Sequence, residues 1–169
     1  YGKDSVEGNE SIKILYHKRF FRYHNWDNVS QSHIKQKGDT VFVRSPCTAN
    51  KWQILYNFAA LAGQSWKIVV YPFLAAPTFS ITYTVSVDSV SFVNINNFNL
   101  KRLYVTYTSN RGDSNASIIT ERLGCDAFMF NYRNSISTAG ESLSENLCYK
   151  DDAFGLTQFT EKPCDYTRC

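Results

Sequence analysis

The sequence has little that supports catalysis or metal chemistry. Its only histidines are His17, His24 and His33, and it has no C-x-x-C pair, which disfavours a zinc site. It also lacks a G-x-S-x-G elbow, an H-E-x-x-H motif and a twelve-residue calcium loop. We therefore expect no catalytic residue, no metal and no cofactor, and we predict that the chain is not an enzyme.

Long hydrophobic runs are also missing. The longest run, from Ile68 to Ala76, is interrupted by Pro72 and is too short to span a bilayer. The sequence starts at Tyr1 without an initiator Met or a basic leader, which predicts a trimmed product or one module of a longer protein. The net charge of +3 is mild and its basic residues are scattered. We expect neither a membrane span nor a nucleic-acid partner.

Strand-forming residues, in contrast, are abundant, with 11 Tyr and 12 Phe among 169 residues. Between Phe79 and Asp88 every second residue is apolar and the residues between them are mostly hydroxyl-bearing. The alternation resumes from Leu103 to Tyr107, after a polar turn at Asn94–Asn97. This period of two is typical of a half-buried antiparallel sheet.

The rest of the chain reads as short strands between turn signals. Turns are predicted at Asn25–Asn28 and Lys37–Asp39, and one turn of helix at Ala59–Gly63. The spacing predicts an all-β fold, a single antiparallel β-barrel or β-sandwich with meander-like order. We expect a polar N-terminal arm at 1–11, whose first ten residues form either an edge element or a loose arm, and an antiparallel β domain at 12–169. The predicted strands are 12–16, 19–23, 29–36, 40–44, 52–58, 65–71, the hairpin between 79 and 107, 118–122, 128–132, 147–150 and 154–160.

Five cysteines occur, and three of them lie in the last 22 residues. Clustered cysteines in a loop-rich segment favour disulfide bonds in an oxidising compartment. We therefore expect a disulfide-stapled, loop-rich C-terminal tail at 145–169, with two bridges and one remaining thiol. The disulfide candidates are Cys47, Cys125, Cys148, Cys164 and Cys169.

Several segments together resemble a known group of proteins. The run from Ile54 to Phe58, followed by Gly63 to Ser65, resembles a leucine-tyrosine-aspartate-phenylalanine, then glycine-aspartate-threonine, signature. That signature belongs to uncharacterised secreted all-β modules of Bacteroidota proteins, which often carry a type IX secretion sorting domain. Asn57 and Gln64 stand where acidic residues are usual. Further segments are similar in the same order, namely 37–43, 83–90, 119–124 and 146–151.

The resemblance implies export and an extracellular or cell-surface location, without implying a reaction. In such proteins Ser or Thr in an Asp-Ser/Thr-Val pattern is a possible O-glycosylation site. The matching residues here are Ser5, Thr40 and Ser89. Turn-then-strand chemistry explains the same pattern without any sugar, and it is the interpretation that we prefer.

Exposed aromatic residues and one short tripeptide each allow a functional and a structural interpretation. Tyr23 and Trp26 are a possible sugar contact, because exposed aromatic rings stack on sugars, although packing is the commoner role. Trp52 and Trp66 lie in apolar contexts that favour the core. Arg111–Asp113 matches an integrin-type tripeptide, but we interpret it as a turn in which Gly112 adopts a positive φ.

A hydrolase that uses paired carboxylates is the third functional hypothesis, with Glu121, Asp126, Glu141 and Glu145 as candidates. The preferred hypothesis is a non-enzymatic extracellular module that acts as a surface, matrix or fibre component. It predicts a homo-oligomer or filament formed through an edge strand or through the 1–11 arm ordered against a neighbouring copy. The alternative is a module that binds a carbohydrate or another small ligand.

Overall fold

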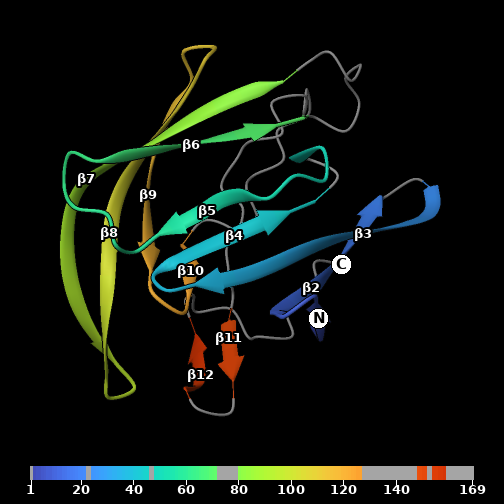
Figure 1. The fold of residues 1–169 in the computed structure, drawn as a ribbon, viewed down its shortest axis with the longest axis horizontal. Helices are drawn as coiled ribbons and strands as arrows, with labels where there is room; N and C mark the ends of the chain where they lie inside the picture. Colours follow the sequence, from blue (N-terminus) through green and yellow to red (C-terminus); the bar gives the residue numbers. More distant parts are fainter. Residues whose placement is uncertain are drawn as a thin grey trace. The chain divides into compact units, whose positions relative to one another are not determined.

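The computed structural model describes the backbone of residues 2–21, 24–45, 48–71, 80–126, 148–151 and 154–158. Within these segments it describes the side chains of 3–15, 31–45, 48–71, 80–126 and 154–156. Every regular element in these ranges is a strand, as Figure 1 shows, so the all-β prediction is confirmed. The strands form two five-stranded antiparallel sheets and one two-stranded sheet.

The first sheet is a meander in which each strand pairs with the next one along the chain. Two of its hairpins turn on a glycine, since Gly8 (φ +63°) links the paired Glu7 and Glu10, and Gly38 (φ +56°) links Lys37 and Thr40. A glycine with positive φ at the first position of a two-residue loop is typical of a type II′ hairpin turn. The strands are β1 (Gly2–Glu7), β2 (Glu10–Phe21), β3 (His24–Lys37), β4 (Thr40–Arg44) and β5 (Gln53–Asn57).

The N-terminal segment is not a loose arm. Gly2 to Glu7 form β1, which pairs with residues 10–15 of the same chain. An arm folded onto its own chain counts against assembly by ordering this segment on a neighbouring copy. The other predicted mode, assembly through an edge strand, would use the outer edge of β1, which is the first strand in the sheet order.

The second sheet is also a meander, in the order β10-β9-β8-β7-β6. The long strands β7 and β8 curve strongly and are joined by a tight turn (Figure 1). Asn96 (φ +51°) and Asn97 (φ +66°) form that turn, as two positive φ angles in a type I′ hairpin require. The strands are β6 (Ser65–Val70), β7 (Ile81–Ile95), β8 (Phe98–Ser109), β9 (Ser114–Thr120) and β10 (Gly124–Cys125).

The core of the second sheet follows the alternation seen in the sequence. In β7 and β8 the buried side chains alternate with half-buried or exposed ones, because successive residues of a strand point to opposite faces. Burying one such aliphatic or aromatic side chain contributes roughly 1.5–3 kcal/mol. The buried residues of these two strands include Ile81, Tyr83, Val85, Val87, Leu100, Leu103, Val105 and Tyr107.

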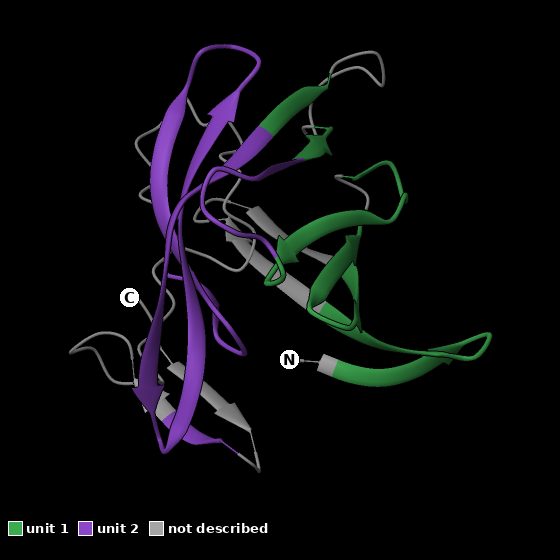
Figure 2. Cartoon of the chain, turned by 60° about the vertical axis from the view of Figure 1, so that its left-hand side comes forward, with its two compact units in different colours: residues 1–59, 67–83 green, residues 60–66, 84–169 purple. Residues whose placement is uncertain are grey.

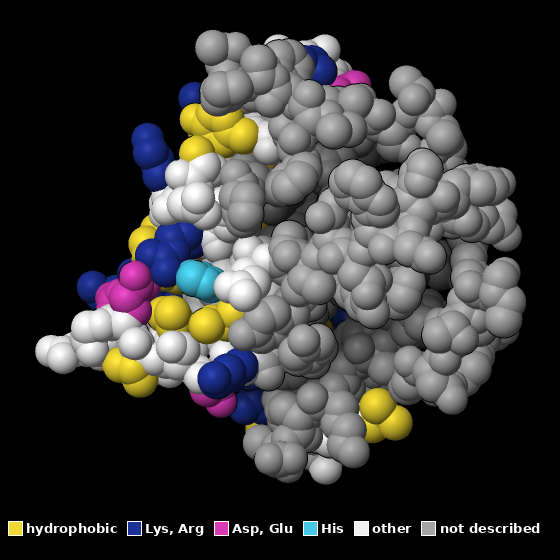
Figure 3. Space-filling model, turned by 90° about the vertical axis from the view of Figure 1, so that its right-hand side faces the viewer, with side chains coloured by type: hydrophobic (Ala, Val, Ile, Leu, Met, Phe, Trp, Pro, Cys, Tyr) yellow, Lys and Arg dark blue, Asp and Glu magenta, His cyan; other side chains and the backbone are white. Residues whose placement is uncertain are grey.

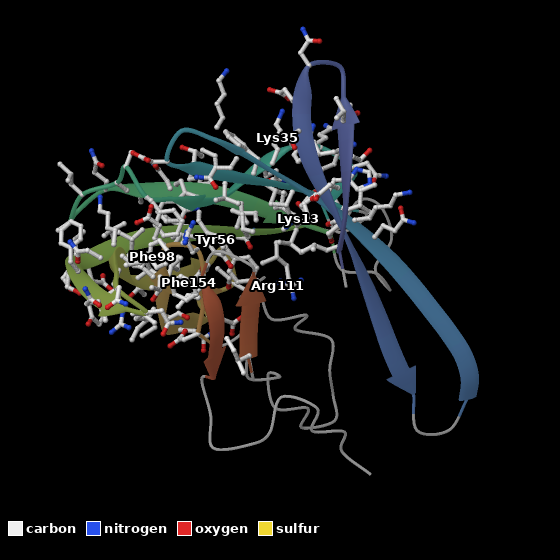
Figure 4. All side chains as sticks on the ribbon, turned by 90° about the horizontal axis from the view of Figure 1, so that it is seen from below. Lys13, Lys35, Tyr56, Phe98, Arg111 and Phe154 are labelled. Atoms are coloured by element: carbon white, nitrogen blue, oxygen red, sulfur yellow. The ribbon has the colours of Figure 1, made fainter. Side chains whose placement is uncertain are left out.

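The segments near the C-terminus form a sheet of their own instead of closing a larger one. β11 (Cys148–Asp151) and β12 (Gly155–Gln158) pair only with each other among the described strands. Buried Phe154, in the turn between them, lies against Phe98 with ring centroids 5.3 Å apart (Figure 4). Asn96 Nδ2 also donates to the Phe154 carbonyl at 2.9 Å. These contacts attach the third sheet to the β7–β8 turn.

Two local predictions were wrong. Asn25–Asn28 lie inside β3 and not in a turn, because Asn28 pairs with Arg19 of β2. Ala59–Gly63 contain no helix, since this segment turns and then pairs with β7. There Gly63 N donates to Val87 O and Val87 N donates to Gln64 O, both at 2.8 Å. The predicted strand 128–132 and most of the cysteine-rich tail lie outside the described residues.

The chain divides into two compact units, coloured separately in Figure 2. Unit 1 comprises residues 1–59 and 67–83, and unit 2 comprises residues 60–66 and 84–169. The meander order holds in both five-stranded sheets, as the sequence predicts. Residues 1–11 and the first strands of the predicted 12–169 domain both belong to unit 1.

Candidate functional site

The predicted sugar contact lies outside the described side chains. The backbone of Trp26 belongs to β3, and Tyr23 is not described. The possible O-glycosylation residues are all in strands: Ser5 in β1, Thr40 at the start of β4 and Ser89 in β7. Ser89 is exposed, whereas the other two are half-buried. Thr40 follows the Gly38-Asp39 turn, so turn-then-strand chemistry accounts for that site, and glycosylation stays a prediction.

The two described carboxylates of the hydrolase hypothesis bind backbone amides. Glu121 Oε2 accepts a hydrogen bond from Lys101 N at 3.2 Å. Asp126 Oδ1 accepts from Ile118 N at 3.1 Å and from Ser117 Oγ at 2.7 Å. Hydrogen bonds of this kind hold a side chain against the backbone of its own chain, so both carboxylates have a structural role here. Glu141 and Glu145 lie outside the described residues.

An open depression of about 300 Å³ lies over β8 and β9 in unit 2. Asp88, at its wall, accepts a hydrogen bond from Thr106 Oγ1 at 2.7 Å. Hydrogen bonds from Ser91 and Arg102 lower the pKa of Tyr104, which also lines the depression. The carboxylates that line the depression, Asp88 and Asp126, therefore already accept hydrogen bonds from uncharged donors of the same chain. The lining residues are Asp88, Tyr104, Val105, Ala116, Ser117, Ile118 and Asp126.

Cys125 lies beside this depression and is a buried thiol. Its Sγ is 2.9 Å from Ser117 Oγ and 3.6 Å from Asp126 Oδ1. With about 1% of its surface exposed, the sulfur is shielded from any substrate in the depression. The other disulfide candidates, Cys47, Cys148, Cys164 and Cys169, lie outside the described side chains, so the disulfide bonds stay a prediction.

Arg111–Asp113 form the predicted turn. Gly112 has φ +91°, and Ser109 Oγ accepts hydrogen bonds from the backbone amides of Arg111 and Asp113. The glycine and the serine together close the loop between β8 and β9. The turn interpretation of this tripeptide is confirmed.

A group of charged and aromatic side chains in unit 1 surrounds Trp52, and we call it the Trp52 network. Lys35 Nζ lies 4.6 Å and Arg44 Cζ 4.7 Å from the indole centroid, within the range of cation–π attraction. Mixed basic, acidic and histidine side chains are visible together in Figure 3. The network consists of Glu7, Glu10, His33, Lys35, Phe42, Arg44 and Trp52.

Each cation of the Trp52 network also binds a carboxylate. Lys35 Nζ is 2.6 Å from Glu10 Oε2, and Arg44 Nη1 is 3.0 Å from Glu7 Oε1. The side chains of Lys35 and Arg44 are only 17% and 21% exposed, so these contacts are screened less than ordinary surface pairs. The hydrogen bond and positive charge of Lys35 lower the pKa of Glu10.

His33 completes the Trp52 network as an acceptor. Arg44 Nη2 lies 2.6 Å from His33 Nδ1. Because a guanidinium only donates, the Nδ1 atom is the acceptor in this contact. His33 thereby links β3 to the guanidinium of β4.

The Trp52 network is better suited to holding the strands of the first sheet together than to binding a ligand. Two carboxylates balance the charges of Lys35 and Arg44, and these cations lie over the indole, where a sugar ring would have to stack. The network joins β1, β2, β3 and β4 to the residue that precedes β5. Trp52 was predicted to be core but is half-buried under charged groups, whereas Trp66 is buried as predicted.

Sequence reasoning missed this network, although part of it follows from a predicted turn. The Gly38 turn pairs β3 with β4 and places Arg44 opposite His33. Charged and aromatic residues at alternate positions of neighbouring strands are the expected units of cross-strand stabilisation. The contact of Glu10 with Lys35 depends on the register of β2 with β3, which neither glycine turn sets, and the Gly8 turn was not predicted from the sequence.

Comparison of the chain with protein-family models, with curated proteins and with solved structures gave no match. In the part of the chain that is described, no helix has the length and apolar character needed to cross a bilayer. The function must therefore be argued from the geometry above.

Proposed function

We propose that this chain is a non-enzymatic structural or assembly module whose role is to present a rigid β scaffold to other copies or partners. The Trp52 network carries the proposal. Its ion pairs and cation–π contacts join side chains from four strands to the residue before the fifth, and thereby resist separation of the first sheet.

Two further observations support a scaffold over a catalyst. The thiol of Cys125 is buried, and the described carboxylates Glu121 and Asp126 accept backbone hydrogen bonds. The first sheet also ends in an exposed edge strand, β1, and an unpaired edge is a template for strand addition.

The proposed setting is extracellular or on a cell surface, in a filament, matrix or coat. This part rests on a resemblance to exported Bacteroidota modules and on the cysteines of the tail. The segments that carry the resemblance are 37–43, 54–58, 63–65, 83–90, 119–124 and 146–151. Exposed Ser89 is the most accessible of the three proposed O-glycosylation residues.

The test is to measure the association state of the full chain across a wide concentration range by sedimentation velocity and to image the material by electron microscopy. We expect reversible association that weakens when Arg44→Gln and Lys35→Met together loosen the first sheet. Lys67→Met, which replaces an exposed lysine of β6, is the matched control and should leave association unchanged. A chain that stays monomeric throughout contradicts the proposal.

The alternative, a carbohydrate-binding module, is separated from the scaffold by a glycan array. Binding that is lost on Trp26→Ala, in a protein that does not associate, would replace the proposed function with sugar recognition. No binding on the array together with association supports the scaffold. Turnover of a glycoside by the purified chain would instead restore the hydrolase hypothesis.

A further inference from the structure

We propose that the outer edge of β1 pairs antiparallel with β1 of a second copy, across a two-fold axis at Ser5, with Lys3 of each copy opposite Glu7 of the other. This inference rests on the proposed assembly function and names the surface through which assembly occurs.

The edge is long and exposed. β1 has six residues and ends the order of the first sheet, and the side chains of Lys3, Asp4, Val6 and Glu7 are exposed. Val6 is 70% exposed, which is unusual for an aliphatic side chain in a strand. The other described edge strands are shorter or engaged. β10 has two residues, and β11 and β12 have four each. The edges β5 and β6 are joined to each other through Gln53 and Val69.

The turn at Gly8 fixes which backbone groups point outward. Glu7 and Glu10 flank a two-residue loop, so they form a hydrogen-bonded pair and direct their amide and carbonyl groups toward each other. Because this direction alternates along a strand, Ser5 and Lys3 also bond inward. The outward donors and acceptors of β1 therefore belong to Asp4 and Val6, with Gly2 at its end.

Antiparallel pairing of two copies must match outward groups with outward groups, which leaves few registers. In the register that places Asp4 opposite Asp4 of the second copy, two like charges face each other. Shifting the second copy by two residues in one direction places Lys3 opposite Lys3, which is again a like pair. A shift in the other direction places Asp4 opposite Val6 and Lys3 opposite Glu7. This register has two symmetric opposite-charge pairs and no like pair. A further shift to Val6 opposite Val6 leaves Lys3 without a charged neighbour.

The same register relieves an existing conflict within the chain. Glu7 and Glu10 lie directly opposite each other, and like charges in that position destabilise a sheet. Arg44 and Lys35 each neutralise one of them. Lys3 of the second copy adds a third cation beside this pair. Charged side chains on an edge strand disfavour pairing with strands that lack complementary charges. A second copy of β1 in this register supplies complementary charges, so its pairing is favoured.

Pairing of one short strand buries little surface, so the contact should be weak and dependent on concentration. A covalent trap detects such a contact. Across the two-fold axis Ser5 faces Ser5 as a non-hydrogen-bonded pair, with Cα atoms about 4.5 Å apart, inside the range that a disulfide spans. Asp4 faces Val6 in this register, so the two Asp4 positions lie diagonally and too far apart.

The experiment compares Ser5→Cys with Asp4→Cys in the full chain under mild oxidation, using non-reducing electrophoresis and mass spectrometry of the linked peptide. The unmodified chain, with its five cysteines, sets the background. We expect a dimer linked through position 5 in Ser5→Cys and none linked through position 4 in Asp4→Cys. Equal cross-linking of both variants, or none in Ser5→Cys, overturns the inference.

Charge reversal tests the register without a covalent bond. Lys3→Glu alone and Glu7→Lys alone should each lose association, because both create like pairs across the axis. An equal mixture of these two variants should associate again, since the two substituted positions then carry opposite charges and the two unchanged positions still do. Lys51→Glu changes an exposed loop lysine and is the matched control. If Glu7→Lys does not fold, because it also loses Arg44, the Ser5→Cys comparison decides.

The outcomes separate this inference from the proposed function. Association that survives Lys3→Glu and gives no link at position 5 overturns the β1 contact and leaves the assembly function standing. No association of the unmodified chain overturns the proposed function and, with it, this contact. Association that is lost in both single variants and regained in the mixture supports both.

Discussion

The side-chain amide of Gln53 forms two hydrogen bonds with the backbone of Val69, as a residue of a neighbouring strand would. Gln53 Nε2 donates to Val69 O at 2.8 Å, while Val69 N donates to Gln53 Oε1 at 2.6 Å. A carboxamide has the same donor and acceptor pair as a peptide group, so it satisfies both backbone groups of Val69. Both residues belong to unit 1, and the contact ties β5 to β6.

Gln53→Leu should therefore destabilise the fold by about 1–3 kcal/mol, because it leaves the amide and carbonyl of Val69 without these partners. Urea unfolding followed by circular dichroism measures the change. Gln36→Leu is the matched control, since its single hydrogen bond to Gly38 O is exposed, and we expect a loss below about 0.5 kcal/mol. Equal losses in the two variants would refute the role given to the Gln53 amide.

Thr48 and Ser45 are neighbouring buried hydroxyls with opposite expected effects. Thr48 Oγ1 accepts from Ser45 N at 2.9 Å and lies within hydrogen-bond distance of the carbonyls of Ser45 and Lys51. Ser45 Oγ has no partner among the described residues. Thr48→Val, which keeps the shape, should cost about 1–3 kcal/mol in the free energy of unfolding.

Ser45→Ala should be neutral or slightly stabilising, because the hydroxyl it removes is buried without a described partner. The same unfolding assay measures both variants. A large loss in Ser45→Ala would show that this hydroxyl binds a group outside the described residues.

The ion pair of Glu10 makes stability fall in acid. Its hydrogen bond and attraction to Lys35 lower the pKa of Glu10 in the folded state from the ordinary value of 4.5. This contribution is fully present above the ordinary pKa and is lost as the pH falls through the lowered one. Carboxyl-carbon NMR should show the Glu10 pKa returning to its ordinary value in Lys35→Met.

Lys13→Met is the control for this titration. Lys13 pairs with Asp4 at 3.9 Å, and both side chains are well exposed, so its removal should leave the pKa of Glu10 unchanged. An unshifted Glu10 in the unmodified chain contradicts the predicted ion pair.

Tyr107 makes stability fall in alkali. Burial, followed by the nearby Cys125 and Asp126, raises its pKa well above the ordinary value of 10.0. The stability contribution is full below that ordinary value and is lost as the pH rises through the higher folded pKa. In ultraviolet titration, Tyr107 should ionise only as the protein unfolds.

Tyr107→Phe should accordingly shift alkaline unfolding to higher pH. Tyr104→Phe is the control, because hydrogen bonds from Ser91 and Arg102 lower the pKa of that half-buried tyrosine. Its removal should not delay alkaline unfolding. An early phenolate signal from Tyr107 in the folded protein would show that the side chain is hydrated.

Much of the strand order followed from the sequence, since local rules specify it. Thr40–Arg44 was predicted with the observed bounds, because the Gly38 turn before it and the alternation within it agree. The alternation after Phe79 likewise predicted the buried face of β7. The residue types of Asn25–Asn28 predicted a turn, but the segment is part of β3. Pairing with β2 overrides the turn tendency of these polar residues.

The Trp52 network and the attachment of Phe154 could not be predicted in the same way. Lys35 and Glu10 are 25 residues apart, and Arg44 and Glu7 are 37 apart. Asn96 and Phe154 are separated by 58 residues. Such contacts depend on the accumulated twist and register of several strands, which no local pattern encodes.

Burial of Cys125 makes its sulfur a reporter of the fold. Because about 1% of the residue is exposed, a thiol reagent can reach the Sγ only when the strands around it separate. The rate of labelling at this position should therefore follow the opening of β9 and β10 in unit 2.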